Sequence, residues 1–381
     1  MARVKYWIWL SCVENVRPLA KYRLVEALGG PERVFFAEEA EIAAVEGVLP
    51  SEVKALCDKS MERVAKVLSD CMEKGIEILT LQDAKYPERL RNIPDPPVVL
   101  YMQGRLPAVD ESLMIAVIGT RKASPYGVKM ARKLGGEIAS GGGIVVSGLA
   151  AGCDCEAMDA ALRAGGSTVG VLGTAIDKVY PAANRWLFNE VRVRGALVSE
   201  YPPGMRTYPD CFKARNRIIS GLSLGVVVTE APRHSGTRVT VNFALEQNRD
   251  VFAVPKNADT GAGGCNDLIA EGAFVATCGE DILRQYETQF DRLQPASAPT
   301  HIKKEIDKPK DIVYIDLTEA PEELPSAQRK ILTAMKAPDM HADDIIEATG
   351  LPAQEVLAGL TMLQVAGFVT QSAGRRYTRK T

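Results

Sequence analysis

The chain has 381 residues, more than one hydrophobic core usually serves, so we expect two or three domains. With 46% hydrophobic and 25% charged residues, the composition excludes the disordered and fibrous classes. The net charge of −2 gives no overall attraction for a polyanion, so any nucleic-acid site needs local clusters of Lys and Arg. No stretch approaches the roughly 18 apolar residues of a membrane span, and the first apolar run is too short for a secretory signal. We therefore expect a cytoplasmic protein.

Eight cysteines are scattered without a Cys-x-x-Cys pair, and only three histidines accompany them. Cys153 and Cys155 are the closest pair, and the fold predicted below would bring Cys211 and Cys265 near them. Reduced, mostly buried thiols explain this spacing better than a metal or redox site does. We expect neither a metal nor a cofactor.

Residues 1–75 predict a small helical domain. One helix is expected over 15–28, stopped by the Gly-Gly-Pro that begins at Gly29, and another over 51–74 with Ser51 as its cap. The run 46–51 resembles the turn of a helix-hairpin-helix or SAM-like module. A strand at 76–79 follows, and four prolines between Pro87 and Pro97 then predict an extended, non-helical lead-in to the next domain.

From Leu113 onward, short β-rich apolar runs alternate with glycine-bearing loops and amphipathic helices. The expected strands are 114–118, 143–146, 167–172, 196–199, 225–229, 251–254 and 273–275. The expected helices are 125–139, 155–164, 184–194, 214–222, 237–247 and 265–271. This alternation predicts an α/β fold, an extended Rossmann-type parallel sheet over 76–285.

The last part of the chain predicts a linker and a third domain. Residues 286–324 lose periodicity and suit a linker. Residues 325–381 predict a C-terminal winged helix, with helices at 326–336, 341–348 and 353–365 before a closing hairpin. Because the third helix lacks the Arg and Lys that DNA contacts need, we favour a protein contact or weak backbone contact over specific duplex recognition.

Ligands of an open parallel sheet bind beyond the carboxyl ends of its strands. The loops there are glycine-rich and open helices: Gly119 and Ser124-Pro125 follow the first strand, Ser147-Gly148 the second and Ser235-Gly236-Thr237 the fifth. Helix N-termini that converge on one edge suit phosphate groups. No loop carries a P-loop or a full Gly-x-Gly-x-x-Gly motif, which disfavours a P-loop NTPase and a conventional dehydrogenase.

The densest cationic segment is Phe212-Lys213-Ala214-Arg215-Asn216-Arg217, preceded by Arg206. Cations beside an exposed aromatic ring would combine phosphate neutralisation with base stacking, the two ingredients of single-strand binding. The alternative is a solvated helix start in which Phe212 packs inward.

An enzyme remains the second hypothesis. Asp154, Asp177, Glu200 and Glu230 follow strands, where general acids or bases of α/β enzymes lie, although bonding to loop amides explains them better. A related class of Rossmann-like enzymes hydrolyses nucleoside monophosphates and carries Pro-Gly-Gly-x-Gly-Thr-x-x-Glu. Only Ser-Gly-Thr of that motif is present at 235–237.

Several ordered motifs together resemble the DNA-processing protein A family, DprA/Smf. They are Ala116-Val117-Ile118-Gly119-Thr120-Arg121, Ser124-Pro125-Tyr126-Gly127, Val146-Ser147-Gly148-Leu149-Ala150, Ser199-Glu200-Tyr201-Pro202-Pro203-Gly204, Arg215-Asn216-Arg217-Ile218-Ile219-Ser220-Gly221 and Val251-Phe252-Ala253-Val254-Pro255. The resemblance implies a homodimer that binds single-stranded DNA, protects it and loads RecA recombinase in natural transformation, without catalytic activity. The DNA-binding residues that we then expect are Gly119, Arg121, Lys122, Ser147, Gly148, Phe212, Lys213, Arg215, Asn216, Arg217, Arg238 and Lys256.

The chain departs from the usual family pattern at several positions. Ala151, Cys153 and Met158 stand where the family usually has arginine, isoleucine and histidine, and the lost arginine would weaken anion binding. The added cations Lys213, Arg238 and Lys256 would compensate if they face the same edge of the sheet.

Overall fold

A computed structural model describes residues 4–233, 235–257, 263–290, 324–335, 340–372 and 376–379 of the chain. Residues 1–300 form one compact unit and residues 301–381 a second. Most of the linker expected at 286–324 lies outside the described residues. Within the described residues, no helix combines the length and the apolar character needed to cross a membrane.

Six short helices open the first unit: α1 (Val4–Cys12), α2 (Pro18–Leu28), α3 (Pro31–Phe36), α4 (Glu39–Ala43), α5 (Pro50–Leu56) and α6 (Glu62–Glu73). The segment 51–74 is thus two helices, and the prediction that Ser51 caps a helix is wrong. Helix α5 begins one residue earlier, where the backbone N–H of Leu49 donates to Glu52 at 2.9 Å. Helix α1 was not predicted, and its apolar residues are almost all buried.

The described strands of the first unit form a nine-stranded sheet in the order β1-β2-β6-β5-β4-β3-β7-β8-β9. Their bounds are β1 (Glu77–Thr80), β2 (Val99–Gly104), β3 (Met114–Ile118), β4 (Ile144–Ser147), β5 (Thr168–Leu172), β6 (Ala196–Ser199), β7 (Gly225–Val228), β8 (Asp250–Ala253) and β9 (Phe274–Val275). Strands β3 to β9 run parallel, whereas β2 is antiparallel to both β1 and β6. The predicted Rossmann-type parallel sheet is confirmed.

The lead-in differs from its prediction because it is part of the sheet. It supplies β1 and β2 and, between them, the short helix α7 (Glu88–Arg91). The prediction of non-helical chain is wrong over α7. Pro87 precedes the first helical residue, and Asp110 accepts hydrogen bonds from the backbone N–H groups of Glu88 and Arg89, both at 2.8 Å. A carboxylate distant in sequence therefore caps a turn that the proline pattern could not predict.

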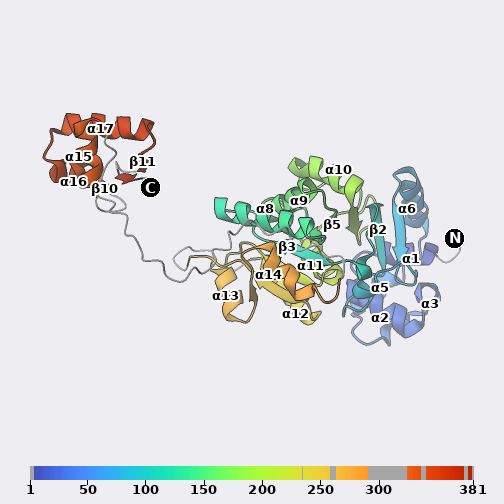
Figure 1. Ribbon diagram of the computed structural model, residues 1–381. Helices are drawn as coiled ribbons and strands as arrows, with labels where there is room; N and C mark the ends of the chain where they lie inside the picture. Colours follow the sequence, from blue (N-terminus) through green and yellow to red (C-terminus); the bar gives the residue numbers. More distant parts are fainter. Residues whose placement is uncertain are drawn as a thin grey trace. The chain divides into compact units, whose positions relative to one another are not determined.

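Helices cover both faces of the sheet (Figure 1). Helices α8 (Pro125–Ser140), α9 (Cys153–Arg163) and α10 (Arg185–Arg194), the last preceded by the 3-10 turn η2 (Ala182–Asn184), pack on one face, and α11 (Pro209–Leu222) and α12 (Thr237–Glu246) on the other. The unit closes with α13 (Gly264–Ala270), α14 (Gly279–Leu283) and η3 (Arg284–Tyr286).

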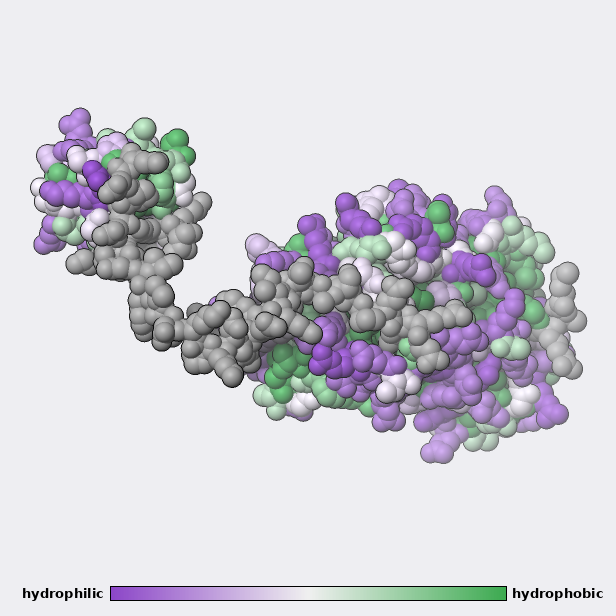
Figure 2. Space-filling model, viewed as in Figure 1, coloured by the Kyte–Doolittle hydropathy of each residue, from purple (hydrophilic) through white to green (hydrophobic). Residues whose placement is uncertain are grey.

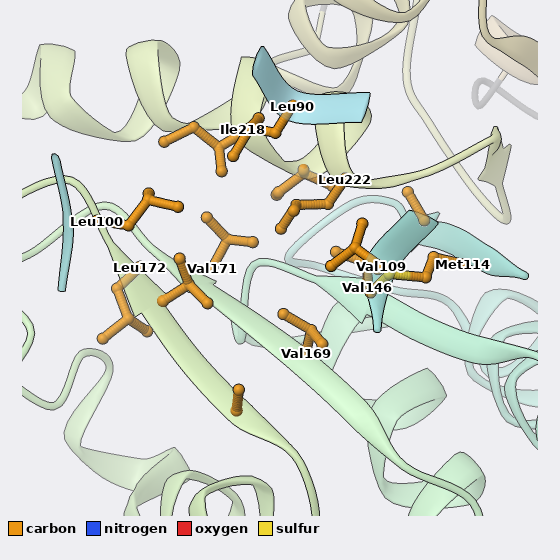
Figure 3. Close-up of a cluster of buried hydrophobic side chains, with 14 of the residues drawn as sticks. Leu90, Leu100, Val109, Met114, Val146, Val169, Val171, Leu172, Ile218 and Leu222 are labelled. Carbon is orange, nitrogen blue, oxygen red and sulfur yellow. The ribbon is translucent and has the colours of Figure 1, made fainter. Parts of the chain in front are cut away.

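The core beneath α11 is built from branched aliphatic side chains (Figure 3). Ile218 and Leu222 of α11 and Leu90 of α7 lie over side chains from the central strands, among them Val169 and Val171 of β5. All five side chains are fully buried. This packing holds α11 at a fixed position on that face of the sheet, and the first turns of the helix help to form the site described below.

The N-terminal helices pack against β2 through buried polar contacts as well as apolar ones. Ser11 and Tyr101 share a hydrogen bond of 2.7 Å between their hydroxyl oxygens. The Lys21 ammonium, also buried, donates to the carbonyl of Ser11 at 2.9 Å. Burial lowers the pKa of Lys21 to about 8, although Glu200 favours the charged form.

The buried Lys21 predicts a specific pH dependence of stability. Because the pKa is lower in the folded chain, the unfolded chain binds more protons from about pH 8 to about pH 10.5, and stability rises with pH there. Between about pH 7 and about pH 9.5, the free energy of unfolding of the wild type should rise by about 2 kcal/mol more than that of the Lys21→Met variant. Urea titrations of both proteins measure this difference. A difference that stays constant with pH would contradict a buried, titrating Lys21.

The second unit is the winged helix expected from the sequence. Its described elements are α15 (Ser326–Ala334), β10 (Met340–His341), α16 (Ala342–Thr349), α17 (Ala353–Val365), β11 (Val369–Ser372) and β12 (Arg376–Arg379). The strands form a small antiparallel sheet in the order β10-β12-β11. Ile331 of α15, Ile345 of α16 and Leu360 of α17 are fully buried and join the three helices in one core.

Candidate nucleic-acid interface

A pocket of about 550 Å³ lies beyond the carboxyl ends of the central strands, and we call it the strand-edge pocket. It is formed by the loop after β3, the start of α9, the first turns of α11 and the segment that opens α12. The residues that line it are Ile118, Gly119, Thr120, Arg121, Lys122, Ala150, Asp154, Phe212, Lys213, Arg215, Asn216, Ile219, Pro232, Ser235, Gly236, Thr237 and Thr240. Of the helix N-termini predicted to converge there, those of α9 and α12 line the pocket through Asp154 and Thr237, whereas Ser124 and Pro125 at the start of α8 do not.

The loop after β3 depends on a glycine. A Cβ atom on Gly119 would lie 2.6 Å from Cys153 Sγ and 2.8 Å from Thr229 Oγ1, so no larger residue fits there without displacing them. The loop then leads to Arg121 and Lys122, both exposed and neither in an ion pair with any described residue. Exposed cations without carboxylate partners are available to an anionic ligand.

An aromatic pair lies next to these cations. The rings of Phe212 and Tyr180 have centroids 5.2 Å apart, and the Arg121 guanidinium lies 6.0 Å from the Phe212 centroid. They help to enclose a second, smaller pocket of about 130 Å³, the aromatic pocket. Its lining residues are Arg121, Gly148, Ala150, Ala151, Tyr180, Pro181, Phe212 and Arg215.

Tyr180 and Pro181 were not predicted as site residues. They lie in the loop after β5, which the sequence analysis considered only for Asp177. An aromatic residue followed by proline, in a loop at the carboxyl edge of the sheet, is the signal that would have found them.

Helix α11 decides which residues of the cationic segment face the site. The helix was expected to begin at 214, but it begins at Pro209, which suits the first helical position because its ring fixes φ and it needs no N–H partner. Phe212 and Lys213 are consequently helical. Phe212, Asn216 and Ile219 recur at helical spacing and line the strand-edge pocket, and the exposed Lys213 lies beside them.

Arg215 is buried and lines both pockets. Its guanidinium donates to the carbonyls of Gly148, at 3.1 Å, and Val171. Burial lowers the pKa of Arg215 to about 10, which nearby Asp154 partly offsets. A Cβ atom on Gly148 would lie 2.5 Å from this guanidinium, so the glycine makes room for it. Arg215 therefore holds the loop after β4 against β5.

Arg217 lies on a different side of α11 and does not line either pocket. It is 1% exposed, and its guanidinium contacts Glu200 at 2.8 Å and Asp95 at 3.1 Å. These contacts join α11 to the loops before β2 and after β6. The geometry gives Arg217 a structural role, and we do not retain it among the proposed DNA contacts.

Three other expected residues also lie outside the two pockets. Ser147 is fully buried and donates to the carbonyl of Val117 at 2.6 Å. Arg238 pairs with Glu271, and Lys256 with Glu230. These pairings leave Arg238 and Lys256 poorly placed to replace the arginine that is absent at Ala151. We therefore do not retain these three residues either.

The four carboxylates that follow strands all have partners among the described residues. Asp154 accepts from the N–H of Gly148 at 3.1 Å, and Asp177 pairs with Lys74 at 2.7 Å. Glu200 pairs with Arg217. Glu230 accepts from the N–H of Ser124 at 2.8 Å and pairs with Lys256; burial alone would raise its pKa, but these partners lower it.

The eight cysteines are spread over the first unit, and Cys153 lies next to Gly119 in the loop after β3. All eight are free thiols. Among the residues that the structure describes, no three His, Cys, Asp or Glu side chains are grouped so as to hold a metal ion. Burial raises the pKa of both Cys153 and Cys155 to about 11, so neither thiol is activated.

The fold and the candidate site together describe a Rossmann-type protein in which unpaired cations and an aromatic pair lie at the carboxyl edge of the sheet. Family models agree with this class: one described as "DNA recombination-mediator protein A" matches residues 77–287, and one described as "DprA winged helix domain" matches residues 316–375. The chain is also 35% identical to Protein Smf of Synechocystis over 98% of each chain. The chain belongs to the DNA processing protein A family, DprA/Smf.

Solved structures of relatives support the same conclusion. The DNA processing protein A of Streptococcus pneumoniae is 32% identical, with a TM-score of 0.64 over 74% of this chain and 97% of that one. The DNA processing protein A of Helicobacter pylori is 28% identical, with a TM-score of 0.51 over 56% of this chain and 97% of that one. The structure of the Helicobacter pylori protein was described for its single-stranded DNA binding mode.

Proposed function

We propose that this protein binds single-stranded DNA at the strand-edge and aromatic pockets. The observation that carries the proposal is the position of Arg121 beside the Phe212–Tyr180 ring pair, with the exposed Lys213 directly after Phe212 on α11. Cations neutralise phosphates and aromatic rings stack on bases without regard to sequence, which is the combination that unpaired strands require. The single-stranded DNA binding described for the Helicobacter pylori relative supports the proposal.

The proposed contacts divide by chemistry. Arg121, Lys122 and Lys213 would neutralise phosphates, and Phe212 and Tyr180 would stack on bases. The glycine-rich turns would let the backbone of the DNA strand approach closely, and the N–H groups of these turns would face its phosphate oxygens. The remaining residues of the expected set that line the pockets, and so belong to the proposal, are Gly119, Gly148, Arg215 and Asn216.

The wider role that we propose follows the family. The protein would act in the cytoplasm as a homodimer, protect incoming single strands, and load RecA recombinase onto them during natural transformation. It would do so without catalysing a reaction.

Fluorescence anisotropy of labelled oligo-dT, with a matched duplex as control, tests the binding. We expect a preference for the single strand, and affinity that falls as salt rises, because each neutralised phosphate contributes about −0.7 to the slope of log K against log salt. Equal affinity for duplex would contradict the proposal. A nuclease-protection assay, and RecA filament assembly on strands pre-coated with single-strand-binding protein, test the two further roles.

The nucleoside-monophosphate hydrolase remains the competing hypothesis, and it has its own test. In such an enzyme Glu230 would be the natural acid or base, but here it is held by Ser124 and Lys256. We expect no base release from nucleoside monophosphates. Release that disappears in Glu230→Gln would favour the enzyme over the DNA-binding protein.

A further inference from the structure

A second cationic groove lies between helix α10 and the loop that follows β5. We call it the α10 groove; its volume is about 400 Å³. Its lining residues are Lys74, Gln103, Ile176, Asp177, Val179, Arg185, Phe188, Asn189, Arg192 and Leu197. Neither the sequence motifs nor the proposed site above includes this groove.

The groove carries cations that no protein carboxylate neutralises. Arg185, Asn189 and Arg192 recur on one side of α10 at helical spacing, and all three are exposed. Neither arginine forms an ion pair or a side-chain hydrogen bond within the described part of the chain. The only acid that lines the groove, Asp177, pairs with Lys74 at 2.7 Å and accepts from the N–H of Gly204 at 3.0 Å. The groove is therefore left with net positive charge.

One loop separates this groove from the DNA site proposed above. The loop leaves β5 at Gly173, where a Cβ atom would lie 2.7 Å from the Phe212 ring, so its start passes directly against the aromatic pocket. Tyr180 and Pro181 of the same loop line the aromatic pocket, whereas its residues 176, 177 and 179 line the α10 groove. An extended ligand that leaves the aromatic pocket across this loop reaches the groove next.

We infer that the α10 groove is a second binding site for the DNA backbone, which holds the part of a long single strand that extends beyond the aromatic pocket. This inference rests on the proposed function. Two unpaired guanidinium groups with a neighbouring amide suit consecutive phosphates, because arginine donates to phosphate oxygens in a bidentate manner. The surface over α10 is mostly hydrophilic (Figure 2), which fits a solvated backbone better than an apolar partner.

Strand length separates the two sites in an experiment. A strand of about eight nucleotides should occupy the pockets alone, and one of about twenty should also reach the groove. In the full-length protein, Arg185→Ala with Arg192→Ala should weaken binding of the long oligo-dT about ten-fold and flatten its salt slope by about 1.4, with the short oligo-dT unaffected. Arg194→Ala is the matched control, because Arg194 is exposed on the same helix but does not line the groove.

Tryptophan emission gives a second measurement at the same helix. Trp7 and Trp9 are buried at 3% and 2% exposure, whereas Trp186, adjacent to Arg185, is 46% exposed. A strand held along α10 should therefore change the emission of Trp186. We expect the change with the long oligo-dT only, and its loss in the Arg185→Ala, Arg192→Ala protein and in Trp186→Phe.

The possible outcomes distinguish the two proposals. If wild-type protein binds neither oligonucleotide, the proposed function itself fails. If both bind equally well, or if the double variant binds the long strand as wild type does, the α10 groove inference is overturned while the proposed function stands. Binding of poly-glutamate that is lost in the double variant, without change for long oligo-dT, would also overturn it and assign the groove to an acidic protein segment.

Discussion

A variant with alanine at both Arg121 and Lys213 is expected to bind single-stranded DNA about a hundred-fold more weakly than wild type at moderate salt. Each charge-assisted contact contributes about 1.5 kcal/mol or more, which is roughly ten-fold in affinity. Both side chains are exposed and line the strand-edge pocket, and among the described residues the only ion pair of either is that of Lys213 with the highly exposed Asp210, at 3.4 Å. Replacing both side chains should therefore weaken DNA binding with little change in the free energy of unfolding. Anisotropy at two salt concentrations should also show a slope shallower by about 1.4.

Arg238→Ala is the matched control for this loss. Arg238 is a partly exposed cation in the same unit, but it pairs with Glu271 and does not line either pocket. Its replacement should leave affinity within about two-fold of wild type. If Arg238→Ala weakened binding as much as the double variant does, the DNA would not be confined to the proposed pockets, and the general charge of the surface would explain its affinity.

Arg217→Met is expected to lower the free energy of unfolding by about 3–5 kcal/mol. The guanidinium is buried between Glu200 and Asp95, and methionine would leave both carboxylates without their cation. One oxygen of each carboxylate already has no hydrogen-bond partner among the described residues. Loss of the guanidinium that the two carboxylates share should destabilise the contact between α11 and the loops before β2 and after β6. Urea unfolding, followed by circular dichroism, measures the change.

Lys213→Met provides the comparison, since it makes the same kind of change four residues earlier on the same helix. Lys213 is 71% exposed, so its replacement should change stability by no more than about 0.5 kcal/mol. The two variants should thus separate folding from binding: Arg217→Met unfolds more easily, and Lys213→Met binds DNA less well. Normal stability with weakened binding in Arg217→Met would restore Arg217 as a DNA contact.

Much of the fold could be predicted because its elements have a local signature. Buried parallel strands are continuous apolar runs, and each is followed by a glycine turn and an amphipathic helix. The strands from β3 to β9 therefore lie close to their predicted positions. Strand β2 was missed because it follows a proline-rich segment and becomes a strand only by pairing with β1 and β6. Helix α7 was missed because its cap, Asp110, lies far along the chain.

The site was predictable to the extent that it lies in loops after strands. Gly119, Arg121 and Lys122 line the strand-edge pocket because the loop after the first parallel strand must lie at that edge. Residue type alone could not separate Lys213 from Arg217. Both are cations in one short segment, and only the start of α11 at Pro209 determines that one is exposed and the other buried.

The sequence by itself determined the fold class, the winged helix, the family and the edge of the sheet where the candidate pockets lie, because these depend on periodicity and on ordered motifs. Only the tertiary structure decided which cations pair with carboxylates of the protein and which stay available to a ligand. Arg217, Arg238 and Lys256 face carboxylates that come from distant parts of the chain. A buried or paired charge is neutralised by whichever residue packs beside it, and that neighbour is set by the packing of helices on the sheet rather than by local sequence.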